Sequence, residues 1–179
     1  MRTRSTLRSQ LKRAWETTIE QHYDHQLINS EHGLQAYFCV ELLQEFDDMS
    51  RRIFIEPQMS FPNGQRRHPD LVICDSKSII GIVEFKYTPK KRPSYKKDLE
   101  TLELAVEHAK TLKISNDRFK GVVSDEKSYK LSPTAVLCWA GVYSGEAVSF
   151  KKSEVVPKLG KHFLQLDART AKGKTATIK

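Results

Sequence analysis

The sequence contains little cysteine, and its placement excludes two kinds of site. Cys39, Cys74 and Cys138 are the only cysteines in 179 residues. Each lies in an apolar stretch, their number is odd, and no two form a C-x-x-C pair. We therefore expect reduced thiols in the core, and neither a disulfide framework nor a zinc or iron-sulfur site.

Long apolar runs are also missing. No stretch is long enough to span a bilayer, and no signal-peptide hydrophobic region follows Met1. We therefore expect a cytoplasmic protein that does not enter a membrane. A length of 179 residues with 39% hydrophobic residues is compatible with one domain that buries a sizeable core.

Acidic residues are outnumbered by basic ones. The chain has 30 Lys and Arg against 22 Asp and Glu, which gives a formal net charge of +8 and a pI near 9.4. Such a balance favours a polyanionic partner, because clustered cations attract phosphates at long range. We expect nucleic acid, with DNA ahead of RNA, and a homodimer or a larger nucleic-acid-processing complex is compatible with that partner.

One stretch of the sequence is typical of a buried β-hairpin. Two apolar, β-branched runs, Leu71–Cys74 and Ile79–Val83, flank a short polar break. Charged residues lie at one end of this hairpin, where Asp70 opens the first strand and Glu84 and Lys86 close the second. Because side chains alternate along a strand, Glu84 and Lys86 share one face of it.

At these residues the sequence resembles the PD-(D/E)XK nuclease superfamily, which has the restriction-endonuclease-like fold. Pro69 and Asp70 match the "PD" of its motif, and Glu84, Phe85 and Lys86 match the "(D/E)XK" on the adjacent strand. Two neighbouring carboxylates repel each other unless a cation lies between them, and hard oxygen ligands suit Mg²⁺ or Mn²⁺.

The resemblance implies a role for each matching residue. Asp70, Glu84 and the main-chain carbonyl of Phe85 would be ligands of a catalytic Mg²⁺ or Mn²⁺ ion. Lys86 would orient the attacking water or stabilise developing charge. The alternative is an edge hairpin whose charged residues form a surface ion pair.

A helix is predicted over Glu31–Phe46, where apolar residues recur at every fourth position after the N-cap residue Ser30. In many members of the superfamily, the helix before the sheet supplies a further acidic residue, and this resemblance implies Glu31 as a catalytic residue and metal ligand. Glu41, which lies further along the same predicted helix on another face, is the rival candidate. The helix dipole alone also favours a carboxylate in the first turn, so a purely structural role for Glu31 stays open.

Basic residues flank the hairpin where a nucleic-acid backbone would lie. Arg66 and Arg67 approach Asp70 and could hold a phosphate. His68 could act as a general acid or could be a solvated side chain.

A proline-rich basic loop follows the hairpin and is predicted to bind nucleic acid, with a solvated connection as the alternative. Its candidate contacts are Lys90, Lys91, Arg92, Tyr95 and Lys96. Tyr95 is expected to stack on an unpaired base.

Before these elements, Met1–Arg13 contains several basic residues and no acidic one. It leads into an apolar stripe at Leu7, Leu11, Trp15 and Ile19. The stripe predicts a helix that docks on the body, while its basic face could contact a nucleic-acid backbone or could be solvated.

The expected fold is α/β, with a mixed central sheet flanked by helices in the α-β-β-β-α-β order of the superfamily. Around the hairpin we expect a strand at 51–59, a helix at 95–113, a loop excursion or peripheral hairpin at 114–133, a central strand at 134–143, and weaker strands at 147–150 and 162–166. The predicted division is a basic helical extension at 1–28, a nuclease-like domain at 29–168 and a basic disordered tail at 169–179.

These observations favour a metal-dependent endonuclease or exonuclease that hydrolyses DNA phosphodiester bonds by direct attack of water. RNA is the second candidate substrate. The alternative function is a nucleic-acid-binding or complex-assembly subunit that has kept the fold without turnover. The acidic pair Asp70 and Glu84 argues against it, because a binding module has no reason to place two carboxylates against phosphates.

Overall fold

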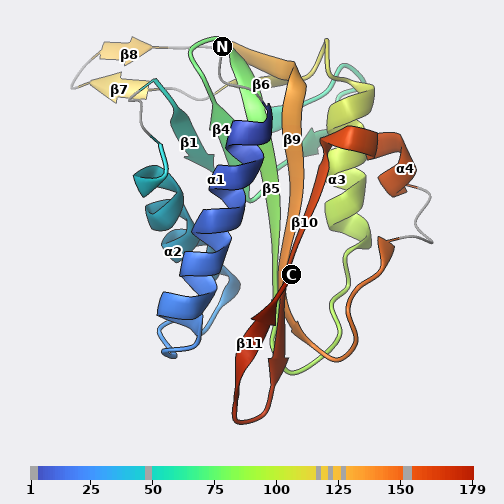
Figure 1. Ribbon diagram of the computed structural model, residues 1–179. Coiled ribbons are helices and arrows are strands. Elements are labelled where there is room, and N and C mark those ends of the chain that lie inside the picture. The colour runs from blue at the N-terminus through green and yellow to red at the C-terminus, as the bar shows by residue number, and fades with distance from the viewer. Residues whose placement is uncertain (1–3, 47–49, 116–117, 121–122, 126–127, 151–154) are drawn as a thin grey trace.

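The protein consists of a central mixed sheet with helices on both faces, which confirms the expected α/β class (Figure 1). The computed structural model describes residues 4–46, 50–115, 118–120, 123–125, 128–150 and 155–179, and Arg2 of the basic N-terminal segment lies outside them. The helices are α1 (Arg4–Thr17), α2 (Glu31–Gln44), α3 (Lys96–Glu107) and α4 (Val155–Leu159). Figure 1 shows α1 and α2 on one side of the sheet and α3 and α4 on the other.

The centre of the sheet is built from two long parallel strands, β5 and β9. β4 pairs antiparallel with β5, β1 pairs antiparallel with β4, and β10 pairs parallel with β9. The bounds of these strands are β1 Arg52–Ile55, β4 Leu71–Cys74, β5 Ser78–Thr88, β9 Ser128–Ser144 and β10 Phe163–Ala171. The sequence α2, β1, β4, β5, α3, β9 therefore follows the predicted α-β-β-β-α-β order.

Shorter strands extend this core. They are β2 Met59–Ser60, β3 Arg66–Arg67, β6 Lys113–Ser115 and β11 Lys174–Ile178, together with a separate two-stranded sheet of β7 Arg118–Lys120 and β8 Val123–Asp125. β2 and β3 pair as a hairpin around the predicted turn, in which Gly64 has a φ of 80°. The β7–β8 pair agrees with the peripheral hairpin expected in this part of the chain.

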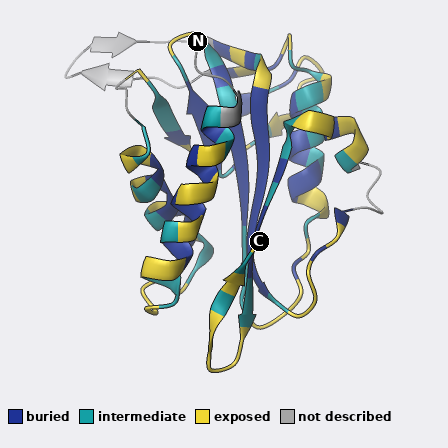
Figure 2. Cartoon of the chain, in the orientation of Figure 1, coloured by how far each residue is buried: buried dark blue, intermediate teal, exposed yellow. Residues whose placement is uncertain are grey.

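The apolar stripes predicted for the first two helices are buried. Leu11, Trp15 and Ile19 of the N-terminal stripe are fully buried, and α1 passes into a π-helical segment at Thr18–Tyr23. Phe38 of α2 packs against Phe85 of β5, with ring centroids 5.2 Å apart. Figure 2 shows the buried residues concentrated in the central strands between the helix layers.

The two faces of β5 have different environments, as the alternation of its side chains predicts. Val83 and Phe85 are buried in the cluster that contains α1 and α2. Ile82 belongs to the cluster on the opposite face, together with residues of α3. Glu84 therefore points toward the α3 side of the sheet.

Two predicted elements are shorter than expected. The strand predicted at 51–59 ends at Ile55, because Glu56 has a left-handed φ of 47° and Pro57 follows. The helix predicted at 95–113 ends at Glu107. The main-chain N–H groups of Thr111 and Leu112 then donate hydrogen bonds to the His108 carbonyl, which closes a turn before β6 begins.

Two other predictions were wrong. Residues 147–150 do not form a strand, and Val148 donates its N–H to the Tyr143 hydroxyl instead of to a neighbouring strand. The tail predicted to be disordered contains β11, which pairs antiparallel with the second half of β10. The main chains of Asp167 and Lys179 close this pairing with two hydrogen bonds of 3.0 and 3.2 Å. The weaker strand predicted at 162–166 is confirmed as the start of β10.

The three cysteines are buried and form no disulfide, as the sequence predicts. Burial raises the pKa of the Cys39 thiol to about 11. None of the helices in the described part of the chain combines the length and the hydropathy that a membrane span requires.

Candidate active site

Asp70 lies at the start of β4 and is tied to β5 through its side chain. Its Oδ2 accepts a hydrogen bond of 2.6 Å from the main-chain N–H of Phe85. Its main-chain carbonyl accepts from the Gln35 side chain of α2 and from the N–H of Glu56. These contacts hold Asp70 between α2 and the end of the β4–β5 hairpin.

Glu84 is a buried carboxylate on the α3 face of β5. Its side chain is only 6% exposed, and its buried Oε1 has no hydrogen-bond partner among the described residues. Such a group carries a large desolvation cost unless something positive lies beside it. Burial, and then the charges of Asp70 and Asp98, raise the pKa of Glu84 well above its ordinary value.

The pKa of Asp70 is raised for the same reasons. Burial is the largest cause, Glu31 and Asp98 add to it, and the Phe85 N–H opposes it, so that the pKa lies at about 6. The charge of Asp70 raises the pKa of Glu84, and the charges of Glu31 and Asp98 raise the pKa of Asp70, so a bound cation would relieve the repulsion among these carboxylates. The pair is therefore chemically suited to a divalent metal ion.

Lys86 carries the positive charge of the site. Its Nζ lies 3.6 Å from Asp98 Oδ1 and 3.7 Å from Glu31 Oε2. Burial lowers the pKa of Lys86, but the charges of Asp98, Glu31 and Asp70 together outweigh burial and raise it above its ordinary value. The amine therefore stays protonated at neutral pH and acts as a hydrogen-bond donor, not as a base.

Sequence reasoning missed Asp98, which lies in the first turn of α3. It is 8% exposed, and its Oδ2 accepts a hydrogen bond of 3.2 Å from the indole Nε1 of Trp139. A Cβ at Gly141 would lie 2.3 Å from the Trp139 ring, so glycine allows the indole to lie against β9. A sequence signal existed, because Asp98 precedes the buried Leu102 by four positions and shares its helix face.

The structure brings Glu31, and not Glu41, to the hairpin. Ser30 caps α2 by accepting the Gly33 N–H at 3.0 Å, which sets the first turn of the helix beside β5. Glu31 Oε2 accepts the main-chain N–H of Tyr87 at 2.9 Å. Glu41 pairs instead with His22, at 2.8 Å.

Glu31 is thus held by main-chain and lysine partners. Within the described residues, no three His, Cys, Asp or Glu side chains are grouped closely enough to hold a metal ion. The expected third carboxylate ligand is therefore not assembled with Asp70 and Glu84 in this structure. Phe85 buries its ring on the opposite face of β5 and contributes its main chain to the site.

These side chains surround a cavity of about 570 Å³. Its wall contains Glu31, Asp70, Glu84, Lys86, Asp98, Lys97, Thr101, Arg66, Arg67 and His68. The β2–β3 hairpin thus brings the predicted phosphate-binding residues Arg66 and Arg67 to the cavity that contains the acidic pair. The exposed His68 lies on the same wall, with its Nδ1 3.3 Å from the Glu56 carbonyl.

The residues of the predicted basic loop differ in their exposure and in their partners. Lys91 and Arg92 are exposed, and Lys90 lines a second cavity. Lys96 pairs with Glu100 on the surface of α3, at 3.9 Å. The ring of Tyr95 packs edge-on against Phe150 and Trp139, which gives it a packing role in this structure, and its stacking on a base stays a prediction.

No protein-family model and no curated protein matches the sequence. Among solved structures, the chain is similar to the cAAA-bound form of NucC from E. coli MS115-1, with a TM-score of 0.37 and 8% sequence identity over 98% of this chain and 81% of that one. A similarity this distant does not indicate the function of the chain.

Proposed function

We propose that the protein is a metal-dependent nuclease of the PD-(D/E)XK type that hydrolyses phosphodiester bonds of DNA. The observation that carries this proposal is the juxtaposition of Asp70, Glu84 and Lys86 at the end of the β4–β5 hairpin, in a cavity that Arg66 and Arg67 also line. An acidic pair suited to a cation, beside cations suited to phosphate, favours phosphoryl chemistry.

Asp70 and Glu84 are the residues that would hold the metal ion. The buried Oε1 of Glu84, which has no hydrogen-bond partner among the described residues, and the raised pKa values of both carboxyl groups fit such a cation. When bound, Mg²⁺ or Mn²⁺ supplies a Lewis acid at the phosphate and lowers the pKa of the attacking water. The Phe85 carbonyl and Glu31 are further candidate ligands by resemblance to the superfamily, and Glu31 would have to exchange its contacts with Lys86 and the Tyr87 N–H for the ion.

The other residues of the cavity act on the substrate. Arg66 and Arg67 present guanidinium groups that form bidentate hydrogen bonds to phosphate oxygens and so fix the position of the nucleic-acid backbone. Lys86 remains protonated, so it donates a hydrogen bond to the attacking water or to the phosphate as negative charge develops. The water oxygen forms a bond to phosphorus and gives up a proton to solvent, while the bond to the leaving oxygen breaks and that oxygen takes up a proton from solvent.

The test is a cleavage panel of linear, circular, nicked, single-stranded and branched DNA and of RNA, each with Mg²⁺, Mn²⁺ or EDTA. We expect cleavage of at least one DNA form with a divalent ion and none in EDTA. If the protein neither binds Mg²⁺ or Mn²⁺ nor cuts any substrate, yet binds DNA equally well in EDTA, it is a nucleic-acid-binding subunit of the same fold.

A further inference from the structure

A second cavity, of about 1020 Å³, lies between the β10–β11 hairpin, the π-helical segment and the loop that follows β5. We call it the hairpin groove and define it by Tyr23, Asp24, Tyr87, Lys90, Lys172 and Lys174, which line it. It is larger than most sites for drug-sized molecules, which suits a segment of a polymer. Figure 1 shows the β10–β11 hairpin projecting beyond the helices at one end of the molecule.

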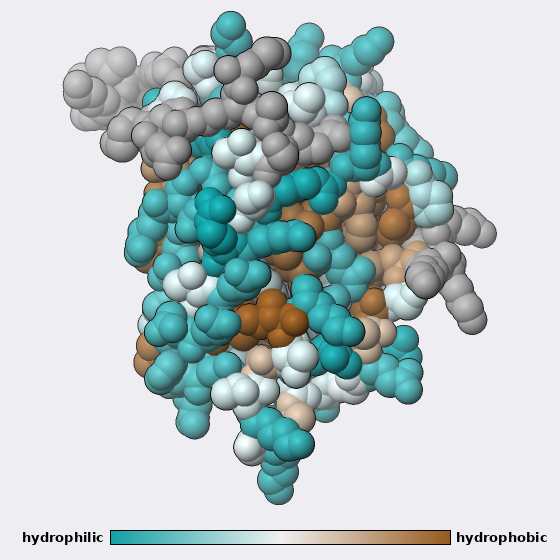
Figure 3. All heavy atoms as spheres, viewed as in Figure 1, coloured by the Kyte–Doolittle hydropathy of each residue, from teal (hydrophilic) through white to brown (hydrophobic). Residues whose placement is uncertain are grey.

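The groove is electropositive. Lys90, Lys172 and Lys174 line it, and among the described residues that line it Asp24 is the one carboxylate. Asp24 Oδ1 accepts the main-chain N–H of Ala176 at 2.9 Å, which ties the hairpin to the π-helical segment. The two segments that supply the lysines, 88–97 and 169–179, contain no acidic residue. Figure 3 shows hydrophilic residues at the hairpin tip.

The walls of the groove are joined by hydrogen bonds. Thr170 Oγ1 of β10 donates to the Pro89 carbonyl at 2.6 Å, and the N–H of Ser144 donates to the Lys91 carbonyl at 3.3 Å. Lys172 and Gly173 form the two-residue turn of the hairpin, in which Gly173 has a φ of 70°. These hydrogen bonds join the loop that bears Lys90 to the hairpin that bears Lys172 and Lys174, so the three lysines lie on one continuous surface.

The groove and the candidate active site lie near the same end of β5, on opposite faces of that strand. Tyr87 lines the groove and donates its main-chain N–H to Glu31, while the preceding Lys86 lines the active-site cavity. A nucleic acid carries one phosphate per about 3.4 Å of axis on each strand, so a substrate cut at the active site has further phosphates on both sides of the cut.

We propose that the hairpin groove binds the sugar-phosphate backbone of the DNA substrate on one side of the phosphate that is cut. This inference rests on the proposed nuclease function and assigns the C-terminal hairpin to substrate binding. Lys90, Lys172 and Lys174 neutralise backbone phosphates without reading sequence. A flat anionic membrane would meet the hairpin tip but not the concave wall that contains Lys90.

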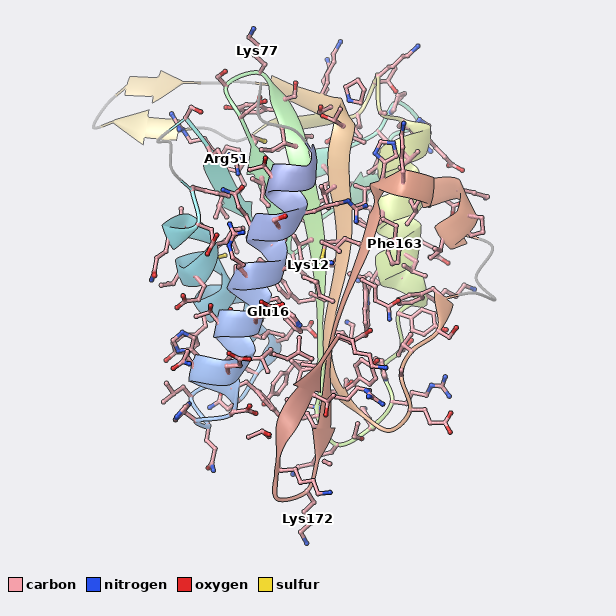
Figure 4. The ribbon with its side chains drawn as sticks, viewed as in Figure 1. Lys12, Glu16, Arg51, Lys77, Phe163 and Lys172 are labelled. Carbon is pink, nitrogen blue, oxygen red and sulfur yellow. The ribbon has the colours of Figure 1, made fainter. Side chains whose placement is uncertain are left out.

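The test compares two double variants that each remove two positive charges. Lys172→Gln with Lys174→Gln changes the groove, while Lys77→Gln with Lys130→Gln is the control. Lys77 precedes β5, and Lys130 pairs with Ser78 at its start. Figure 4 shows Lys77 and Lys172 at opposite ends of the molecule. The 11 residues of β5 span about 33 Å, well beyond the Debye length of about 8 Å at physiological salt.

Binding of a short labelled duplex is measured by anisotropy in EDTA, over about 50 to 200 mM salt. The groove variant should bind more weakly, and its slope of log affinity against log salt should be shallower by about 1 to 2, since each lost phosphate contact removes about 0.9. The control should keep the slope of the unmodified protein. Matching melting curves for both variants, whose substituted side chains are exposed, show that the fold is intact.

The possible results separate the two proposals. If the unmodified protein binds and cuts DNA but the groove variant and the control have equal slopes, the hairpin groove is not a DNA-binding site and the nuclease proposal stands. If the unmodified protein neither binds nor cuts DNA, the proposed function itself fails. If the groove substitutions abolish binding to phosphatidylserine vesicles and leave DNA binding unchanged, the partner is a membrane and the inference is overturned.

Discussion

Lys86 Nζ lies 3.6 Å from Asp98 Oδ1, although the two residues belong to β5 and to the first turn of α3. Trp139 holds the other carboxylate oxygen of Asp98 through its indole N–H. Lys86 is therefore held by the carboxylate of Asp98, which is itself fixed by Trp139 of β9. We infer that Asp98 is a positioning residue, which keeps the ammonium group of Lys86 charged and aimed into the cavity.

Replacing Asp98 by Asn should lower kcat by about tenfold or more and leave KM for DNA nearly unchanged. The Asn amide oxygen can still accept the Trp139 N–H, but the neutral amide no longer balances the charge of Lys86. The ammonium group then moves from its position and stabilises the developing negative charge less well. Steady-state cleavage kinetics give the split between kcat and KM. Glu100→Gln, on the surface of the same helix, is the matched control and should change neither. An unchanged kcat in the Asp98 variant would limit this residue to a packing role.

Substituting Glu31 tests whether the upstream carboxylate takes part in the reaction. Glu31→Gln should reduce cleavage by about tenfold or more, while Gln can still accept the Tyr87 N–H. Loss of a first-turn carboxylate alone should cost only about 0.3 to 1 kcal/mol of stability. Glu41→Gln, which perturbs the pair with His22, should lower the melting temperature and leave cleavage intact. The reverse pattern would assign the upstream role to Glu41.

The hairpin and the charges at its end were predictable because they depend on local sequence. Alternation fixes which face of β5 carries Glu84, and the N-cap Ser30 fixes where the helix that bears Glu31 begins. Both signals lie within a few residues of the groups they position. The same holds for the Gly64 turn, which brings Arg66 and Arg67 alongside β2.

Asp98 and the C-terminal hairpin were not predicted because their partners are distant in sequence. The spacing of Asp98 from Leu102 places it on the buried face of α3, but only the fold shows that Lys86 and Trp139 meet it there. The small, basic tail looks disordered by composition, yet β11 is stabilised by pairing with β10. Long-range pairing of this kind leaves no periodic pattern within the segment itself.

The raised pKa of Asp70 predicts how metal-free stability depends on pH. Its ordinary pKa of 3.8 becomes about 6 in the folded protein. Between these values the unfolded chain releases the proton more readily, so rising pH favours unfolding until about pH 6. In EDTA, Asp70→Asn should therefore melt at nearly the same temperature as the unmodified protein near pH 4 and at a higher temperature above pH 6. A lower melting temperature for the variant at pH 7 contradicts this.

The three motif residues should separate metal binding from catalysis. Asp70→Ala and Glu84→Ala should each abolish cleavage and Mg²⁺ binding, because the remaining carboxylate alone holds the ion poorly. DNA binding in EDTA should survive or tighten, since a carboxylate that faces phosphates has been removed. Lys86→Ala should retain Mg²⁺ binding while cleavage falls, because the lysine is a donor and not a ligand. Calorimetric metal titration beside the cleavage assay decides: full Mg²⁺ binding by both carboxylate variants would place the ion elsewhere.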